Sequence, residues 1–385
     1  MKRDWQKIRL KEIGSVCMCK RILKHQTNTE KGIPFYKIGT FGKKADAFIS
    51  EELYKKYKNK YNYPENGDIL ISAAGTLGET VVYDGKPAYF QDSNIVWLKH
   101  DNTKAINKFL FYVYAMKPWK VPESSTIPRL YNDNILNTYI LLPPLPEQEK
   151  IAEILGTWDS TIEKLTALIA AKRLQKKGLM QKLLTARIRL PSFTGEWASF
   201  EFKNISFLIK EKYSPISSEH YKCVELEHID PHSARLLGYV DSSEQHSVKN
   251  KFYKKDIIFG KLRPYLKKFY KVTFNGVCST EFWVLRGKNG TCLTDFLYWL
   301  IQMPEFNAVC NVSSGTHMPR ADWSYVSEIP FSIPTDISEQ KAIADILSKA
   351  DEEIDLLTRK LDLLQSQKKG LMQQLLTGKI RVKVA

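Results

Sequence analysis

The chain has 385 residues, enough for two or three domains that each bury a hydrophobic core. Hydrophobic residues make up 43% and charged residues 26%, which is typical of folded globular proteins and excludes disordered and fibrous chains. The net charge of +16 favours a polyanionic partner, either nucleic acid or an anionic membrane surface.

Residues 14–140 are expected to form a first mixed α/β module with many short strands. β-branched and aromatic residues are enriched in DILIS at 68–72, ETVVYD at 79–84 and NIVWLK at 94–99, which predicts a strand at each. Turns are predicted at Gly67, Gly75, Gly78 and Gly85. These patterns leave the order of the strands open.

A long helix is predicted over residues 147–189. Its apolar residues follow alternating steps of four and three, the 3.5-residue period of a coiled-coil seam. The seam residues are Ile151, Leu155, Trp158, Ile162, Leu165, Ile169, Leu179 and Leu183. Lys172 and Lys176 occupy positions where the seam should continue. Pro146 ahead of the helix and Glu147 in its first turn are typical start signals.

A second module, at residues 206–332, shares only a few short sequence segments with the first, in the same order. KDIIFG at 255–260 echoes GDILIS, and STEFWVL at 279–285 echoes DSNIVWL of the first module. Pro319-Arg320 likewise echoes Pro128-Arg129. Helical spacing of apolar residues predicts one helix in each module, over 105–116 and 293–303.

Residues 339–381 repeat residues 147–189 without a gap, at an offset of 192, and about half of the aligned positions are identical. The block QKKGLMQ occurs unchanged in both copies, and Trp5 and Trp197 share the same offset. The chain is therefore a duplication in which two unlike modules alternate with two similar helical segments.

The second helical copy keeps the coiled-coil seam. Its seam residues are Ile343, Leu347, Ala350, Ile354, Leu357, Leu361, Leu364, Leu371 and Leu375. Lys368 interrupts the seam, and Ser338 followed by Glu339 is the start signal. About 35 helical residues with a rise of ~1.5 Å each give a rod of roughly 50 Å. An exposed seam of that length needs a partner, and the other helical copy is the nearest candidate.

Motifs of several enzyme classes are absent. The sequence contains no G-x-x-x-x-G-K-[ST] phosphate loop and no glycine-rich strand-to-helix loop for a cofactor. The double proline in LLPPLP lacks the neighbours that an amino-methyltransferase uses, and the E-x-K triplets lack the upstream acid of a nuclease. Cys17-x-Cys19 has the wrong spacing for a zinc site. We therefore expect no catalytic residue, no metal site and no cofactor in this chain.

The sequence also indicates where the protein works. No apolar run approaches the ~20 residues of a membrane span, and no apolar stretch follows the charged residues at the N-terminus as in a signal peptide. The six cysteines are irregularly spaced and do not suggest a disulfide framework. We expect reduced cysteines, no membrane partner and a cytoplasmic location.

The strongest binding signal is a basic and aromatic stretch at residues 249–271. It holds nine Lys or Arg and six aromatic residues, with only Asp256 opposing them. Basic groups neutralise phosphates, while aromatic and arginine side chains pack on sugars or read base edges. The alternative is a strand pair whose aromatic residues belong to the core and whose lysines are only solvated. Residues 54–63, YKKYKNKYNY, show a similar mixture.

Polar loops in both modules supply further candidates for DNA contact. Arg129 and Arg320 lie at matching places and could contact phosphates or guanine, or could pair with a carboxylate that holds the loop. The turn containing Ser72 and Thr76 could approach a DNA backbone closely. The full set of candidate DNA-contacting residues is Lys43, Lys44, Ser72, Thr76, Arg129, Lys261, Arg263, Lys267, Lys268, His317 and Arg320.

The layout resembles the specificity (S) subunit of type I restriction–modification systems over the whole chain. The segments that carry the resemblance are PPLPEQEKIAEIL with QKKGLMQKLLT, their copies SEQKAIADIL with QKKGLMQQLLT, the TGEW entry to the second module, and GKLRPYLKK followed by CSTEFWVL. The resemblance implies a mixed α/β fold with a pseudo-twofold repeat. Its parts would be target-recognition domains at 1–146 and 191–338 and constant helical regions at 147–190 and 339–385, the helices pairing as an antiparallel coiled coil.

The resemblance also implies a function. Each recognition domain would read one half of a split target in double-stranded DNA, and the helices would set the spacer between the halves. Two modification subunits, which carry S-adenosylmethionine, would dock on the two equivalent frames. Restriction subunits carrying ATP, Mg²⁺ and the nuclease would join them. The resemblance supplies no catalytic residue in this chain.

Two other classes remain alternatives. One is a basic coiled-coil scaffold that binds DNA without sequence preference. The divergence of the two modules argues against it, because a scaffold has no reason to diversify only there. The other is a self-contained restriction or methylation enzyme, against which stand the missing motifs. Closure of the layout, with the first and last residues meeting, is implied by the resemblance alone.

Overall fold

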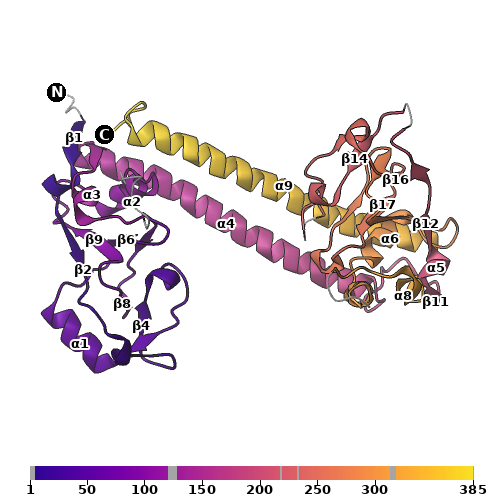
Figure 1. Ribbon diagram of the computed structural model, residues 1–385, viewed down its shortest axis with the longest axis horizontal. Helices are drawn as coiled ribbons and strands as arrows, with labels where there is room; N and C mark the ends of the chain where they lie inside the picture. Colours follow the sequence, from indigo (N-terminus) through magenta and orange to yellow (C-terminus); the bar gives the residue numbers. More distant parts are fainter. Residues whose placement is uncertain (1–4, 120–127, 217–218, 232–233, 313–317, 385) are drawn as a thin grey trace. The chain divides into compact units, whose positions relative to one another are not determined.

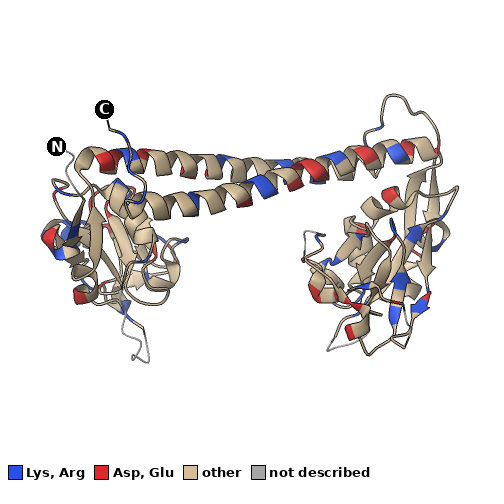
Figure 2. Ribbon diagram, turned by 90° about the horizontal axis from the view of Figure 1, so that it is seen from above, with Lys and Arg blue, Asp and Glu red and all other residues tan. Residues whose placement is uncertain are grey.

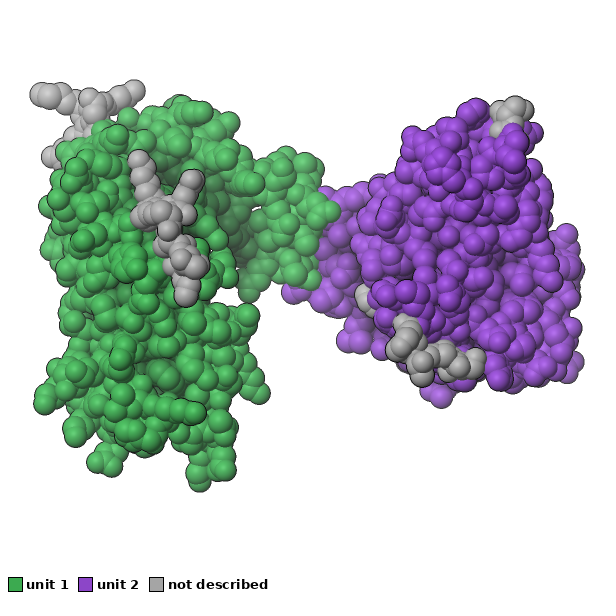
Figure 3. All heavy atoms as spheres, viewed as in Figure 1, with its two compact units in different colours: residues 1–166, 360–385 green, residues 167–359 purple. Residues whose placement is uncertain are grey.

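The computed structural model describes residues 5–119, 128–216, 219–231, 234–312 and 318–384. The chain divides into two compact units, which are coloured separately in Figure 3. Unit 1 comprises residues 1–166 and 360–385, and unit 2 comprises residues 167–359. Each unit thus combines one module with a part of both long helices.

Unit 1 is a mixed α/β body (Figure 1). Its strands are β1 (Gln6–Arg9), β2 (Ser15–Met18), β3 (Thr27–Asn28), β4 (Ile33–Tyr36), β5 (Phe48–Ile49), β6 (Ile69–Ser72), β7 (Thr80–Val82), β8 (Tyr89–Phe90), β9 (Ile95–Lys99) and β10 (Tyr139–Leu142). Its helices are α1 (Glu51–Lys60), α2 (Asn107–Ala115), α3 (Asn132–Leu136) and the first part of α4 (Leu145–Leu183).

The strands of unit 1 form three small sheets. An antiparallel sheet has the order β2-β9-β6-β7, a second sheet has the order β3-β5-β4-β8, and β1 pairs with β10. All four residues of β6 are buried, because the strand lies between β9 and β7 and a hydrophobic core covers each face, Ile69 and Ile71 belonging to one core and Leu70 to another. Leu70 of β6 faces Trp97 of β9 in this register.

Unit 2 contains the same kinds of elements. Its strands are β11 (Trp197–Glu201), β12 (Ser206–Ile209), β13 (Lys212–Tyr213), β14 (Lys222–Val224), β15 (Val240–Asp241), β16 (Lys249–Phe252), β17 (Ile257–Gly260), β18 (Phe269–Lys271), β19 (Gly276–Cys278), β20 (Phe282–Gly287) and β21 (Pro330–Pro334). Its helices are α5 (Phe202–Ile205), α6 (Thr294–Leu300), α7 (Pro304–Cys310), α8 (Trp323–Val326) and the first part of α9 (Ile337–Leu376).

The sheets of unit 2 repeat the plan of unit 1. The order β12-β20-β17-β18 matches β2-β9-β6-β7 strand for strand, and the pair β11-β21 matches β1-β10. The remaining sheet has the order β13-β16-β19-β14-β15. The echoes GDILIS and KDIIFG therefore lie on equivalent strands, β6 and β17, and the mixed α/β fold with an internal repeat is confirmed.

The two long helices pack against each other within each unit. In unit 1, Ile151 and Leu155 of α4 share a hydrophobic core with Leu375 of α9. In unit 2, Leu183 near the end of α4 shares a core with Ile343 near the start of α9. The beginning of one helix thus meets the end of the other, which is the antiparallel pairing predicted for the seam.

The lysines that interrupt the seam make ion pairs between the helices. Lys176 of α4 pairs with Asp351 of α9 in unit 2, and Lys368 of α9 pairs with Asp159 of α4 in unit 1. Lys172 pairs with Glu353 at 2.7 Å. Figure 2 shows the resulting alternation of positive and negative residues along both helices.

The start signals differ from those predicted. Helix α4 begins at Leu145, so Pro146 lies in its first turn and not ahead of it. Helix α9 begins at Ile337, and Asp336 accepts a hydrogen bond from the backbone N–H of Ser338 at 2.7 Å. Asp336, not Ser338, therefore caps α9, because a carboxylate at this place satisfies a free N–H of the first turn.

The first and last parts of the described chain meet in unit 1. Glu147, which is 7% exposed, accepts hydrogen bonds from Trp5 Nε1 at 3.1 Å and from Arg381 Nε at 2.9 Å. Unit 2 has the same arrangement around Glu339, which binds Arg189 at 2.7 Å through Nη2. Residues that are 192 positions apart in the two copies therefore make equivalent contacts as well as matching in sequence.

Candidate nucleic-acid interface

A tight hairpin turn joins β6 to β7 in unit 1. Ser72 N donates to Glu79 O at 2.9 Å and closes the turn over residues 73–79. The Ser72 hydroxyl donates to Thr76 O at 2.5 Å and accepts from Glu79 N at 2.8 Å. Ser72 is 2% exposed, so its hydroxyl shapes the turn from inside. Thr76, in contrast, lies exposed on the turn.

Two other loops of unit 1 are bonded to this turn. Ala73 N donates to Asn94 O at 2.7 Å, in the loop ahead of β9, and Leu130 N donates to Ala73 O at 2.9 Å. Arg129, next to Leu130, donates from Nη2 to Ser93 O at 2.7 Å. The three segments therefore form one surface held by backbone hydrogen bonds.

Unit 2 builds the same arrangement around residues 261–268, between β17 and β18. Lys261 N donates to Glu281 O at 2.9 Å, and Ala321 N donates to Lys261 O at 2.8 Å. Arg320 binds both carboxylate oxygens of Glu281, at 3.1 and 3.2 Å. We call the turn and its two neighbouring loops the turn cluster of each unit.

The two arginines take part in holding their loops. Arg320 has the carboxylate partner that the sequence left as an alternative to DNA contact, and this partner raises the pKa of its guanidinium. Arg129 instead binds a backbone carbonyl. Half of the Arg320 side chain is still exposed, so the pairing leaves it accessible from solvent.

Lys43 and Lys44 lie exposed between β4 and β5 of unit 1. This segment is close to the turn cluster, because a Cβ on Gly75 would lie 3.4 Å from Ile38 Cγ1 and one on Gly42 would lie 3.4 Å from Val81 Cγ2. The two lysines have no side-chain partner among the described residues.

The basic stretch of unit 2 is divided between internal pairs and free cations. Lys249 binds Glu225 at 2.6 Å and Lys271 binds Asp295 at 3.0 Å. Lys268 donates to Leu226 O at 2.6 Å. Lys251 lies between two carboxylates, 3.4 Å from Glu211 and 4.0 Å from Glu219. These four lysines bind groups of unit 2 itself, whereas the alternative interpretation of the stretch expected lysines that are only solvated.

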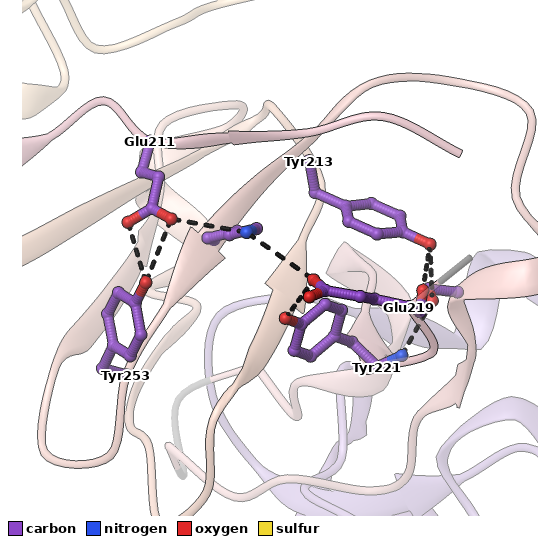
Figure 4. A network of polar contacts seen from close by, with 7 residues as sticks. Glu211, Tyr213, Glu219, Tyr221 and Tyr253 are labelled. Atoms are coloured by element: carbon purple, nitrogen blue, oxygen red, sulfur yellow. Dashed lines mark hydrogen bonds and ion pairs between the residues drawn. The ribbon is translucent and has the colours of Figure 1, made fainter. Parts of the chain in front are cut away.

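Figure 4 shows that Glu211 and Glu219, the two carboxylates paired with Lys251, also bind tyrosines. Tyr253 donates to both oxygens of Glu211, at 3.0 and 2.9 Å, and Tyr221 donates to Glu219 at 2.6 Å. These hydrogen bonds raise the pKa of both tyrosine hydroxyls. The network holds two carboxylates for one ammonium, so this part of unit 2 is a poor surface for a polyanion.

The remaining cations of the stretch make no side-chain hydrogen bond or ion pair within the described part of the chain. They are Lys254, Lys255, Lys261, Arg263 and Lys267. Three of them, Lys261, Arg263 and Lys267, belong to the turn cluster. His317 lies outside the described residues. Sequence reasoning did not assign the loops containing Asn94 and Glu281 to the site, although both residues lie within the echoed segments DSNIVWL and STEFWVL.

The described residues contain no group of three or more His, Cys, Asp or Glu that could hold a metal ion, and no helix among them is long and apolar enough to cross a membrane. All six cysteines are buried free thiols. Burial raises the pKa of Cys292 and Cys310 to about 12, which disfavours the reactive thiolate.

Comparison with known proteins agrees with this fold. The family described as "Type I restriction modification DNA specificity domain" matches residues 2–172 and 195–366. The two matches cover most of the chain and include most of both long helices. The chain belongs to the type I restriction–modification DNA specificity family.

Three relatives illustrate the similarity. A Haemophilus influenzae chain with the provisional name of type I restriction enzyme specificity subunit is 54% identical over 159 residues, 41% of each chain. The EcoDI specificity subunit of Escherichia coli is 24% identical over 71% of this chain and 69% of its own. The MjaVIII specificity subunit of Methanocaldococcus jannaschii is 25% identical over 86% and 83%.

Two solved structures share the fold. The S subunit of a type I system from M. genitalium superposes with a TM-score of 0.62, at 15% identity, covering 97% of this chain and 96% of that one. A structure described as concerning complex assembly and conformational transition of the type I system gives a TM-score of 0.54, at 14% identity, covering 97% of both chains.

Proposed function

We propose that the chain is a non-catalytic specificity subunit that recognises a split target in double-stranded DNA. Each unit reads one half of the target with its turn cluster. The observation that supports this most strongly is the repetition of the cluster, with the same backbone hydrogen bonds, in two modules of different sequence. Equivalent frames with different exposed side chains suit two different short sequences.

We further propose that the paired helices set the spacer between the half-sites and dock two modification subunits, which restriction subunits can join. Supporting this is the near-identity of the contacts at Glu147 and Glu339, which gives a partner two similar surfaces. S-adenosylmethionine, ATP and Mg²⁺ belong to the partner subunits in this proposal. The complex works in the cytoplasm in this proposal.

The competing function is a basic scaffold that binds DNA without sequence preference. It shares the net charge and the paired helices, but it does not account for two diverged modules on one frame. Only the specificity subunit predicts a DNA motif with two defined halves.

Methylation sequencing tests the proposal. DNA is sequenced from cells that express this chain together with the modification subunit of its system, and from cells that express the modification subunit alone. We expect methyl-adenine in both halves of a split motif only when this chain is present. A motif that persists without the chain, or its absence when both proteins are made, contradicts the proposal. As a control for activity of the chain itself, purified protein with S-adenosylmethionine and DNA should show no turnover.

A further inference from the structure

The two units differ in how they fill three equivalent backbone positions. In unit 1 the three residues with positive φ around β6 are Gly67, Gly75 and Gly78, with φ of 92°, 64° and 71°. In unit 2 the three around β17 are Lys255, Arg263 and Lys267, with φ of 80°, 50° and 51°. Every glycine of this set is thus replaced by a cation.

Hydrogen bonds show that the positions are equivalent. Gly67 N donates to Tyr83 O and Lys255 N to Val272 O, both at 2.8 Å, just before β6 and β17. Arg263, like Gly75, is the third residue after its strand.

The last position lies at the far side of each turn. Gly78 and Lys267 each immediately precede the residue whose carbonyl closes the hairpin, Glu79 in unit 1 and Lys268 in unit 2. The turns differ by one residue in length but keep both left-handed positions.

A side chain at these positions has an energetic cost. Residues other than glycine are disfavoured in the left-handed region, because Cβ approaches the carbonyl oxygen that follows it. Unit 1 shows that the fold accepts glycine at all three places. Folding alone therefore does not call for Arg263 and Lys267, and strained residues kept without a folding need are typical of functional sites.

The turn of unit 2 presents these two side chains on a fixed backbone. Pro264 is buried, Lys268 binds the carbonyl of Leu226 at 2.6 Å, and Arg263 N donates to Pro319 O at 2.8 Å. Arg263 and Lys267 are exposed and have no side-chain partner among the described residues. The backbone is anchored on three sides while the two cations stay available.

We propose that Arg263 reads base edges in the half-site of unit 2, that Lys267 binds a phosphate beside it, and that unit 1 approaches its half-site through the exposed backbone of Gly75, since Gly78 is buried against Trp119. This rests on the proposed function. The planar guanidinium can form two parallel hydrogen bonds to a guanine edge, whereas an ammonium acts as a point charge. The two units therefore use one scaffold with two modes of contact.

Single glycine substitutions test this inference, because they restore the residue that unit 1 uses. Arg263→Gly, Lys267→Gly and the matched control Lys255→Gly each remove one positive charge and one strained residue. Lys255 lies at the opposite end of β17 from the turn. The full chain, in complex with modification subunits, is mixed with a library of random-sequence duplexes, and the bound DNA is sequenced. Affinity for the enriched duplex and the thermal midpoint are then measured.

We expect Arg263→Gly to weaken binding about tenfold or more and to relax base preference in one half of the motif only. Lys267→Gly should weaken binding to all duplexes similarly, with a smaller salt dependence. Lys255→Gly should leave affinity within about twofold of the parent. None of the three should lower the thermal midpoint, because glycine relieves strain at each position.

The outcomes separate this inference from the proposed function. If the parent chain enriches a split motif and Arg263→Gly retains both its halves and its affinity, the inference is wrong while the proposed function stands. If Lys255→Gly weakens binding as much as Arg263→Gly, general charge and not the turn is responsible, which also overturns it. If the parent enriches no motif, both fail. Arg263→Asn, which tolerates the same backbone, must agree with Arg263→Gly.

Discussion

At the scale of single residues, a buried carboxylate joins the beginning and the end of unit 1. Glu147 lies in the first turn of α4 and accepts hydrogen bonds from Trp5 and Arg381. The hydrogen bond from Arg381 is the largest cause of a lowered pKa at Glu147. A carboxylate at a helix start also interacts favourably with the free N–H groups there.

The lowered pKa predicts a pH dependence. Ionised Glu147 stabilises the fold fully above the unfolded-state pKa of about 4.3, and this contribution is lost as the pH falls through the lower folded-state pKa. We expect the protection of residues 377–384, measured as hydrogen exchange relative to the intrinsic rate at each pH, to fall on acidification in that range. In Glu147→Gln the protection should already be lower at neutral pH and should change less with pH. An unchanged pH profile in this variant would contradict the role of Glu147.

The same scale shows what sequence reasoning could reach in the candidate site. Composition marked the residues of the turn, since cations and glycines stand out along a strand pattern. It did not reveal which cations are free, because Glu281 is 39 residues from Arg320 in the chain and reaches it only through the fold. Nor did it reveal the left-handed backbone of Arg263, since glycine and, to a lesser degree, asparagine and aspartate signal that conformation and arginine does not.

At the scale of elements, the seam lysines bind the helices to each other and to the modules. Lys368 pairs with Asp159 and lies 5.4 Å from the ring centre of Tyr112, while Lys176 pairs with Asp351 and lies 5.1 Å from that of Trp299. An apolar residue would continue the seam but would not distinguish one register from another. A polar pair inside a coiled coil selects register at some cost in stability.

A double-mutant cycle tests the seam pair in unit 1. We expect Lys368→Ala and Asp159→Ala to show a coupling of about 1 kcal/mol in urea unfolding, because Lys368 is largely shielded while Asp159 is partly solvated. The more exposed pair of Lys172 and Glu353 serves as the control, with a coupling near ~0.3 kcal/mol. Both lysines interrupt the seam, so equal couplings would mean that the greater burial of the Lys368 pair contributes nothing.

The sequence predicted these helices well and their surroundings poorly. The heptad pattern recurs over neighbouring helical turns, and the duplication repeats the same residues 192 positions later, so both can be recognised in the sequence itself. From the sequence alone, Lys368 and Lys176 only interrupt the apolar seam, because the aspartates that pair with them lie on the other helix. The strand order was left open for the same reason: short strands with similar composition pair by tertiary contact, as β2 pairs with β9 and β9 with β6.

At the scale of the whole molecule, the duplication produces two units with matching junctions. Arg381 binds Glu147 in unit 1, and Arg189 binds Glu339 in unit 2. In each case a tryptophan completes the contact, and the arginine side chain lies within about 6 Å of its ring centre. Residues after α9 therefore complete the junction in unit 1, and residues after α4 complete the junction in unit 2.

This symmetry supplies a matched pair of variants. We expect Arg381→Ala to destabilise unit 1 and Arg189→Ala to destabilise unit 2, each by about 2 kcal/mol, because either change leaves a buried carboxylate with one partner fewer. Hydrogen exchange resolved along the chain measures this. Faster exchange should be confined to the unit that carries the change. Loss of protection spread equally over both units by either variant would contradict two separate junctions.

The amino-acid sequence by itself determined the duplication, the long helices and their seam, the alternation of unlike modules, and the family, because these depend on periodicity and repetition along the chain. The tertiary structure alone decided the sheet order, the partners of the seam lysines, the closure at Glu147, and which cations of the basic stretch are free. Each of these depends on groups far apart in sequence that meet only after folding, when burial makes an unpaired charge costly and selects the contacts that satisfy it.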